Sequence, residues 1–123
     1  MSTGSPGFIS LQKAINMTTR YRENMNAVID PVYGSRGVLC ICDTFDKAAV
    51  ATLVNKPECA AIRLYYGMNE DLQLRPILVA VNSNNEDILP VSSTLGNDAV
   101  SDDIVDDSLK CPPFCPPASP LNP

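Results

Sequence analysis

Cysteine is the residue type with the most chemical potential in this sequence. The chain contains five cysteines and no histidine. Without an imidazole, Ser-His and Cys-His nucleophilic sites and zinc sites that depend on histidine are excluded. An enzyme would have to use Asp, Glu, Lys, Tyr or Cys, and the sequence has no recognisable catalytic motif built from them. We therefore expect a protein that is not an enzyme.

Two of the cysteines lie near the end of the chain, in the stretch KCPPFCPPASPLNP. Pro112, Pro113 and Phe114 separate Cys111 from Cys115. A Pro-Pro pair favours the extended polyproline II helix, which rises about 3.1 Å per residue and would place the two Cα atoms about 12 Å apart. A disulfide requires less than about 7 Å. Closure therefore needs a turn, for example through a cis proline, and an oxidising environment.

We interpret this proline-rich tail as a peptide that a partner holds. Prolines lower the conformational entropy that binding must overcome, and Phe114 offers an apolar anchor between two thiols. The predicted partner-binding residues are Cys111, Pro112, Pro113, Phe114, Cys115 and Pro116. The expected partner is another protein or a neighbouring copy of the chain. A plain C-terminal spacer is the competing interpretation.

A thiol-based metal or redox protein is the alternative function. Cys40 and Cys42 alternate with Ile41, so on a strand both point to one face. Together with Cys111 and Cys115 they would supply four thiolates, a ligand set that suits zinc. Against this, the spacing differs from the usual CxxC pairs, and residues 38–42 resemble buried core. Under the leading interpretation no cofactor is expected.

The net charge has opposite signs in two parts of the chain. Residues 1–85 contain eight basic and seven acidic residues, whereas residues 86–123 contain one basic and seven acidic residues, for a net charge of −5. Neither part has the basic stripe that phosphate binding requires, so no nucleic-acid partner is expected. The N-terminus does not resemble a secretory signal, and the longest apolar run is far shorter than the about 20 residues of a membrane span. We expect an acidic cytoplasmic protein without a membrane span.

Hydrophobic periodicity predicts two helices and three or four strands. The helices are expected over residues 10–25 and 44–54, with Ser10 and Asp43 as N-caps. The strands are expected over residues 38–42, 59–66 and 74–82, with a short edge strand over 87–91. The predicted fold class is α+β, in which two helices pack on a small, mainly antiparallel sheet of three or four strands.

Composition predicts four regions along the chain. These are a flexible N-terminus over residues 1–9, an α+β domain over 10–91, an acidic linker over 92–110 and a Pro/Cys-rich tail over 111–123. The linker contains too little apolar surface to offset the entropy of ordering it. Its like charges also disfavour a helix, since they would stand four residues apart. The acidic residues are Asp98, Asp102, Asp103, Asp106 and Asp107.

The segment AAIRLYYGMNEDLQLRPILVAVNSNNEDIL and the CPPFC tail resemble a family of small proteins from Bacteroidota. That family has an early amphipathic helix ending near a Tyr-Arg pair, here Tyr21-Arg22. It also has an RIYYG-like strand, here Arg63 to Gly67, and a terminal CPPxC. The present chain departs in its Asp-rich spacer and in the prolines beyond Cys115. The resemblance implies a bacterial α+β protein and carries over no activity.

Overall fold

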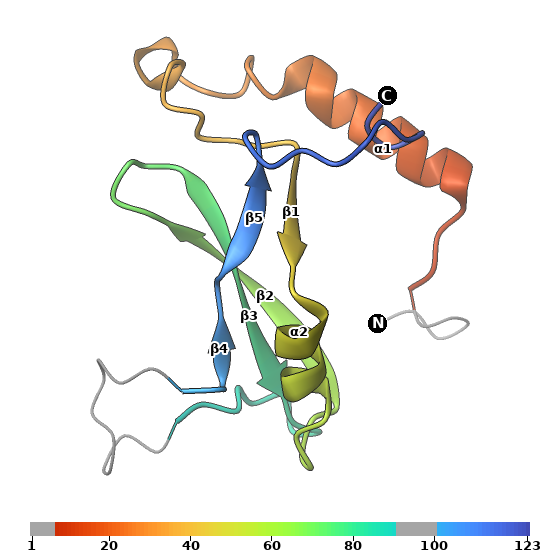
Figure 1. The fold of residues 1–123 in the computed structure, drawn as a ribbon, viewed down its shortest axis with the longest axis vertical. Helices are drawn as coiled ribbons and strands as arrows, with labels where there is room; N and C mark the ends of the chain where they lie inside the picture. The colour runs from red at the N-terminus through yellow and green to blue at the C-terminus, as the bar shows by residue number, and fades with distance from the viewer. Residues whose placement is uncertain (1–6, 91–100) are drawn as a thin grey trace.

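The fold is α+β, as predicted, and its strands form two antiparallel sheets (Figure 1). A computed structural model describes residues 7–90 and 101–123 of the chain. One sheet has the order β2-β3-β4 and the other is the pair β1-β5. The elements are α1 (Leu11–Asn24), the 3-10 turn η1 (Pro31–Tyr33), β1 (Cys42–Phe45), α2 (Lys47–Val54), β2 (Ala61–Met68), β3 (Leu74–Val81), β4 (Ile104–Val105) and β5 (Ser108–Cys111).

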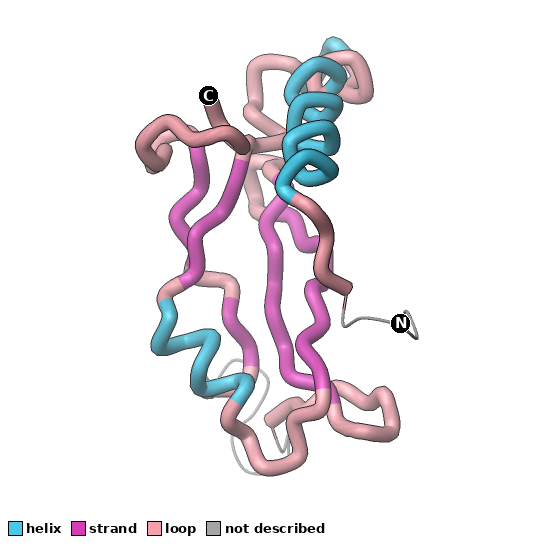
Figure 2. The backbone as a smooth tube through the Cα atoms, turned by 90° about the vertical axis from the view of Figure 1, so that its right-hand side faces the viewer, coloured by secondary structure: helices cyan, strands magenta, loops and turns pink. Residues whose placement is uncertain are grey.

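The hydrophobic core lies between α2 and the strands β2 and β3. Leu53 of α2 is fully buried against Leu78 and Ala80 of β3, and Phe45 and Val105 pack at the margin. Four consecutive residues of β3, from Leu78 to Val81, are buried. A run of this kind has both faces of the strand covered. β3 is thus the strand around which the core is built, and Figure 2 shows it beside β2 in a long hairpin.

Helix α1 lies beside the C-terminal segment, to one side of the ends of β1 and β5 (Figure 1). Ser10 caps it as predicted, because its side chain accepts a hydrogen bond from the Lys13 N–H at 3.0 Å. No residue of α1 is fully buried. Side chains attach it instead: the Tyr21 hydroxyl donates to the carbonyl oxygen of Cys40, and Arg22 Nη1 donates to the Leu121 carbonyl at 2.6 Å. The helix therefore joins the loop before β1 to the end of the chain.

The strand predicted over residues 38–42 lies further along the chain, at Cys42–Phe45. The backbone of residues 38–41 bonds to three different elements. The Val38 carbonyl accepts from the Leu74 N–H at 2.8 Å, the Cys40 carbonyl accepts from Tyr21, and the Ile41 N–H donates to the Cys111 carbonyl at 2.8 Å. These backbone groups bond to different elements rather than to one neighbouring strand. The prediction of a strand over residues 38–42 was therefore wrong.

Helix α2 begins three residues later than predicted. Asp46, rather than Asp43, occupies the N-cap position, and its side chain makes no capping hydrogen bond. Asp43 belongs to β1, where it pairs with Lys110 in the register of the β1-β5 ladder. The difference arises because β5 supplies a strand partner for residues 42–45, and tertiary pairing overrides the local cap signal.

The segment predicted as an acidic linker contributes two strands. β4 pairs with β3 through Val105 and Leu78, and β5 pairs with β1 through Lys110 and Asp43. The acidic side chains are also tied down, because Lys56 Nζ lies 3.3 Å from Asp102 Oδ1 and 2.7 Å from Asp103 Oδ1. The fold therefore extends past residue 91, and the linker interpretation is wrong for residues 104–110.

Some predictions fall outside the described residues. Residues 1–6, which are part of the predicted flexible N-terminus, and residues 91–100, which include Asp98 and the end of the predicted edge strand, lie there. Of that edge strand, Asp87 forms a single antiparallel bridge with Val81. Among residues 7–90 and 101–123, no helix has the length and hydropathy needed to cross a membrane.

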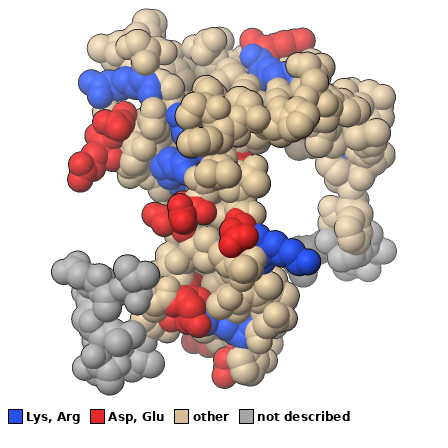
Figure 3. All heavy atoms as spheres, viewed as in Figure 1, with Lys and Arg blue, Asp and Glu red and all other residues tan. Residues whose placement is uncertain are grey.

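Charged side chains on the visible face lie in mixed groups (Figure 3). Lys and Arg side chains stand close to Asp and Glu side chains there. Ion pairs join Lys56 to Asp102 and Asp103, Arg63 to Asp87, and Arg75 to Asp43. Each pair links segments that are distant in the sequence. These ion pairs therefore help to connect elements of the fold.

Leu53→Ala tests the position of the core. Because Leu53 is fully buried, we expect the substitution to lower the free energy of unfolding by about 2–5 kcal/mol. Urea denaturation followed by circular dichroism measures this value. The same substitution at Leu89, which is 52% exposed, is the matched control and should change stability by less than about 0.5 kcal/mol. Equal effects at the two positions would contradict the placement of the core.

Candidate functional site

Among residues 7–90 and 101–123, no strand pairs with the outer edge of β2 in the three-stranded sheet, and this open edge carries a row of exposed apolar side chains. β2 lies at the edge of the order β2-β3-β4 and is paired on one side by β3. Alternate residues of a strand share one face. We call the alternate residues Ile62, Leu64, Tyr66 and Met68 the β2 stripe; they are 40%, 45%, 81% and 56% exposed. A soluble domain usually protects such an edge with charge, proline or a covering element.

The β2 stripe continues the hydrophobic core outward. Ile62 pairs with Ala80 and Leu64 pairs with Leu78 across the β2-β3 ladder. Directly opposed residues point to the same face of a sheet. The stripe therefore lies on the face that α2 covers at β3, but beyond the area that α2 shields. A strand that pairs with the edge of β2 would therefore add its apolar side chains to the existing core.

An apolar hollow adjoins one end of the stripe. Its volume is about 390 Å³. The wall includes Met68 of the stripe and Leu72 of the β2-β3 turn. The other lining residues are Val28, Ile29, Asp30, Tyr33 and Val38. The stripe and the hollow meet at Met68, which belongs to both.

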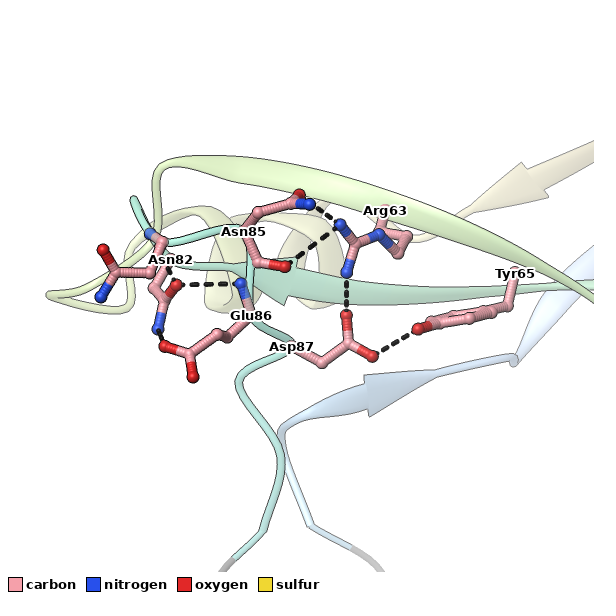
Figure 4. Close-up of polar contacts among 7 residues, drawn as sticks. Arg63, Tyr65, Asn82, Asn85, Glu86 and Asp87 are labelled. Atoms are coloured by element: carbon pink, nitrogen blue, oxygen red, sulfur yellow. Dashed lines mark hydrogen bonds and ion pairs between the residues drawn. The ribbon is translucent and has the colours of Figure 1, made fainter.

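The other face of β2 is polar and fixed by a hydrogen-bonded network (Figure 4). Arg63 Nη1 forms an ion pair with Asp87, and the Tyr65 hydroxyl donates to the second oxygen of that carboxylate at 2.5 Å. Arg63 Nη2 donates to Asn85 Oδ1 at 2.5 Å. The hydrogen bond from Tyr65, together with Arg63, lowers the pKa of the Asp87 carboxyl, and the same bond raises the pKa of Tyr65. The network holds the turn after β3 against β2 and leaves the β2 stripe on the opposite face.

The cysteines of the predicted partner-binding tail form a disulfide. Cys111 is bonded to Cys115, and their Cα atoms are 4.5 Å apart. The chain turns back between them, with the Phe114 N–H donating to the Lys110 carbonyl at 2.8 Å and with cis bonds before Pro112 and Pro113. The extended polyproline geometry expected from the sequence is therefore wrong for this segment. The sequence predicted that a disulfide requires a turn between the two cysteines, and the structure contains this turn.

The predicted partner-binding residues differ in accessibility. Cys111 is 1% exposed and lies in β5, so it cannot contact a partner. Pro112, Pro113, Cys115 and Pro116 are exposed, and the Phe114 side chain is 60% exposed. The tail rests on its own domain through β5 and through the contact between Arg22 and Leu121. Residues 108–111 are therefore a strand of the domain and not part of an arm that extends toward a partner.

The four cysteines of the zinc interpretation do not form a common site. Cys111 and Cys115 are joined to each other, whereas Cys40 and Cys42 are free thiols. Cys40 Sγ donates to Asp43 Oδ2 at 3.3 Å. In the described part of the chain, no group of three or more Cys, Asp or Glu side chains is arranged to hold a metal ion. The zinc interpretation is wrong for the disulfide-bonded protein.

A partly buried polar cluster joins the two sheets around Asp43. Asp43 Oδ1 accepts hydrogen bonds from Arg75 Nη1 at 2.9 Å and from Ser108 Oγ at 3.0 Å. Arg75 Nη2 also contacts Ser108 Oγ at 2.8 Å. Burial, followed by the hydrogen bond to Asp43, raises the pKa of the Cys40 thiol to about 11. The cluster connects β1, β3 and β5. The Cys40 thiol beside it stays protonated at neutral pH.

No model of a known protein family matches the chain, and no curated protein or solved structure is significantly similar to it.

Sequence reasoning missed the β2 stripe as a surface. The sequence predicted a strand over residues 59–66, where the structure has β2, but it did not predict that Ile62, Leu64 and Tyr66 are exposed. The exposure follows from the position of β2 at the edge of the sheet, which sequence reasoning did not address. The available signal was the second helix, which is too short to cover two strands of eight residues each from end to end.

Asp43→Asn tests the cluster that joins the sheets. We expect the free energy of unfolding to fall by about 1–3 kcal/mol, because a charged acceptor of several hydrogen bonds is lost. Asp46→Asn is the control, since Asp46 makes no capping bond and Asn caps a helix as well as Asp does. Urea denaturation measures both. Identical midpoints for the two variants would contradict the role given to Asp43.

The Cys40 thiol gives a prediction in alkaline solution. Its alkylation by iodoacetamide should rise with pH around a midpoint of about 11, rather than around the ordinary 9.0. Because the pKa is higher in the folded state, the contribution of this thiol to stability is complete below pH 9.0 and is lost as the pH rises through about 11. Asp43→Asn should lower the midpoint only in part, since burial is the larger cause. Peptide mass spectrometry of the alkylated protein follows the rate, and a midpoint at 9.0 would refute the prediction.

Proposed function

We propose that the protein is a non-enzymatic assembly component that associates with a second copy of itself through the open edge of β2. The β2 stripe beside an unpaired strand edge carries the proposal. The backbone groups on the outer side of an edge strand are available to pair with another strand. A second β2 placed antiparallel would satisfy them and would join two three-stranded sheets into one.

The apolar face favours a copy of the same chain over an unrelated partner. In a symmetric dimer each surface meets itself, so a charged surface would repel its copy. The β2 stripe contains no charged residue, and the one charge of β2, Arg63, is paired with Asp87 on the other face. A self-complementary contact therefore meets no like-charge repulsion. The stripe also supplies Tyr66, an aromatic residue of the kind that dominates interface energies.

A thiol-based redox protein is the second candidate function. The bond between Cys111 and Cys115 favours it, because it joins a buried cysteine to an exposed one. Counting free thiols in protein purified without reductant tests this candidate: three support the disulfide and five oppose it. The bacterial source and the cytoplasmic location stay predictions from the sequence. A stable disulfide is more common in oxidising compartments, so localisation of the tagged protein in a bacterial host is the corresponding test.

Tyr66→Lys tests the proposed assembly. Losing an aromatic side chain at the centre of an interface costs about 2 kcal/mol or more, so we expect self-association to weaken by about 30-fold or more. Tyr66 is 81% exposed, so the substitution leaves the core of the monomer intact. Sedimentation equilibrium over a range of concentrations gives the association constant.

Phe114→Lys is the matched control for this experiment. It makes the same change of charge at another exposed aromatic side chain, on the tail. It should leave self-association unchanged. A wild-type protein that stays monomeric would refute the proposal. Loss of association in Phe114→Lys, but not in Tyr66→Lys, would assign the interface to the tail instead.

A further inference from the structure

A free thiol stands across the strand pair from the disulfide. Cys42 of β1 is the register partner of Cys111 of β5. Cys42 is a free thiol, while Cys111 is bonded to Cys115. Opposed residues of antiparallel strands have Cα atoms about 4.5–5.5 Å apart and side chains on the same face. This separation lies within the about 4.4–6.8 Å that disulfides span.

The three sulfurs differ in their access to solvent. Cys111 is 1% exposed, so a thiol from outside the protein cannot reach its sulfur. Cys42 is half-buried and lies directly beside it, and Cys115 is exposed. A thiolate attacks a disulfide at one sulfur and the other sulfur leaves. The arrangement thus has an internal attacking group, a shielded central sulfur and a leaving group at the surface.

The other free cysteines do not share this position. The Cys40 thiol is held by Asp43, and burial raises its pKa to about 11, so it supplies little thiolate near neutral pH. Cys59 lies in the connection between α2 and β2, where its thiol donates to the Ala61 carbonyl at 3.4 Å. Among the free thiols of the described residues, Cys42 is the one paired with a disulfide cysteine.

We propose that Cys42 exchanges with the disulfide, so that the protein interconverts between a Cys111–Cys115 form and a Cys42–Cys111 form. The Cys42 thiolate attacks Cys111 Sγ and forms a new sulfur-sulfur bond. The bond between Cys111 and Cys115 breaks, and its electron pair leaves on Cys115 Sγ, which takes a proton from water. Cys42 is oxidised and Cys115 is reduced, so no outside oxidant or reductant is needed. This inference deepens the redox candidate and does not depend on assembly through β2.

The exchange changes the surface next to Phe114. In the Cys111–Cys115 form the loop from residue 111 to residue 115 is closed by its own disulfide. In the Cys42–Cys111 form the two strands β1 and β5 are bonded to each other and the loop is open. The Cys115 thiol then stands free at the surface, beside an exposed aromatic side chain. The exchange is thus a switch that places a reactive thiol at the tail.

Disulfide mapping tests the exchange directly. Trypsin cleaves after Arg36, Lys47 and Lys110, so one peptide holds Cys40 and Cys42 and another holds Cys111 and Cys115. The Cys111–Cys115 form leaves these peptides separate, whereas the exchanged form links them. The full chain, purified without reductant, is incubated at pH 8.5 or at pH 4, and its free thiols are blocked with N-ethylmaleimide before digestion. We expect linked peptides carrying a maleimide on Cys115, and more of them after pH 8.5 because exchange requires thiolate.

Two serine variants identify the attacking thiol. Cys42→Ser should abolish the linked peptides and the labelling of Cys115, whereas Cys40→Ser should retain both. Linked peptides that survive in Cys42→Ser and vanish in Cys40→Ser would overturn the assignment. A wild-type protein whose Cys115 is never labelled would overturn the exchange itself, and so would one with five free thiols. Those wild-type readouts hold even if a variant folds poorly, and neither depends on whether the protein is a dimer.

Discussion

The Asp43 carboxylate is the constraint on which the arrangement of the two sheets depends. The sheets share no strand, since β1 and β5 form one and β2, β3 and β4 form the other. Asp43 of β1 bonds to Arg75 of β3 and to Ser108 of β5. A two-stranded ribbon is marginally stable by itself in water. The partly buried ion pair therefore places the β1-β5 ribbon, and with it both the disulfide and its neighbouring thiol, against the main sheet.

The sequence predicted the parts of the fold that rest on local pattern. The first helix, with its Ser10 cap, and the hairpin of β2 and β3 follow from periodicity that the structure retains. The predictions failed where a distant partner decides the structure. Asp43 looked like a helix cap and became a strand residue, because β5 pairs with it. The acidic segment looked too polar to order, yet Lys56 pairs with two of its carboxylates, Arg75 donates hydrogen bonds to Ser108, and β3 and β1 supply the strand pairing.

The functional surfaces were harder to predict because they depend on what is left uncovered. An alternating sequence pattern is the same for a strand in the middle of a sheet and for one at its edge. The pattern alone therefore did not predict that Ile62, Leu64 and Tyr66 are exposed. The tail shows the opposite problem. Its prolines suggested an extended peptide, and the turn that brings Cys111 to Cys115 is fixed by contacts such as the bond from Phe114 to Lys110. Neither the free edge nor the closed loop is a property of a short stretch of sequence.

The pairing of β1 with β5 also sets the order in which the protein can be completed during synthesis. Asp43 and Ser108 are 65 positions apart in the chain. Contacts at long range in the sequence are slow to form, because the intervening chain must first be made and its loop closed. On the ribosome, α1 and the β2-β3 hairpin can form while β1 still has no partner strand. The emergence of residues 108–111 is thus the step at which Cys42 first meets Cys111, and the chemistry of these two sulfurs begins only after β5 has been made and paired with β1.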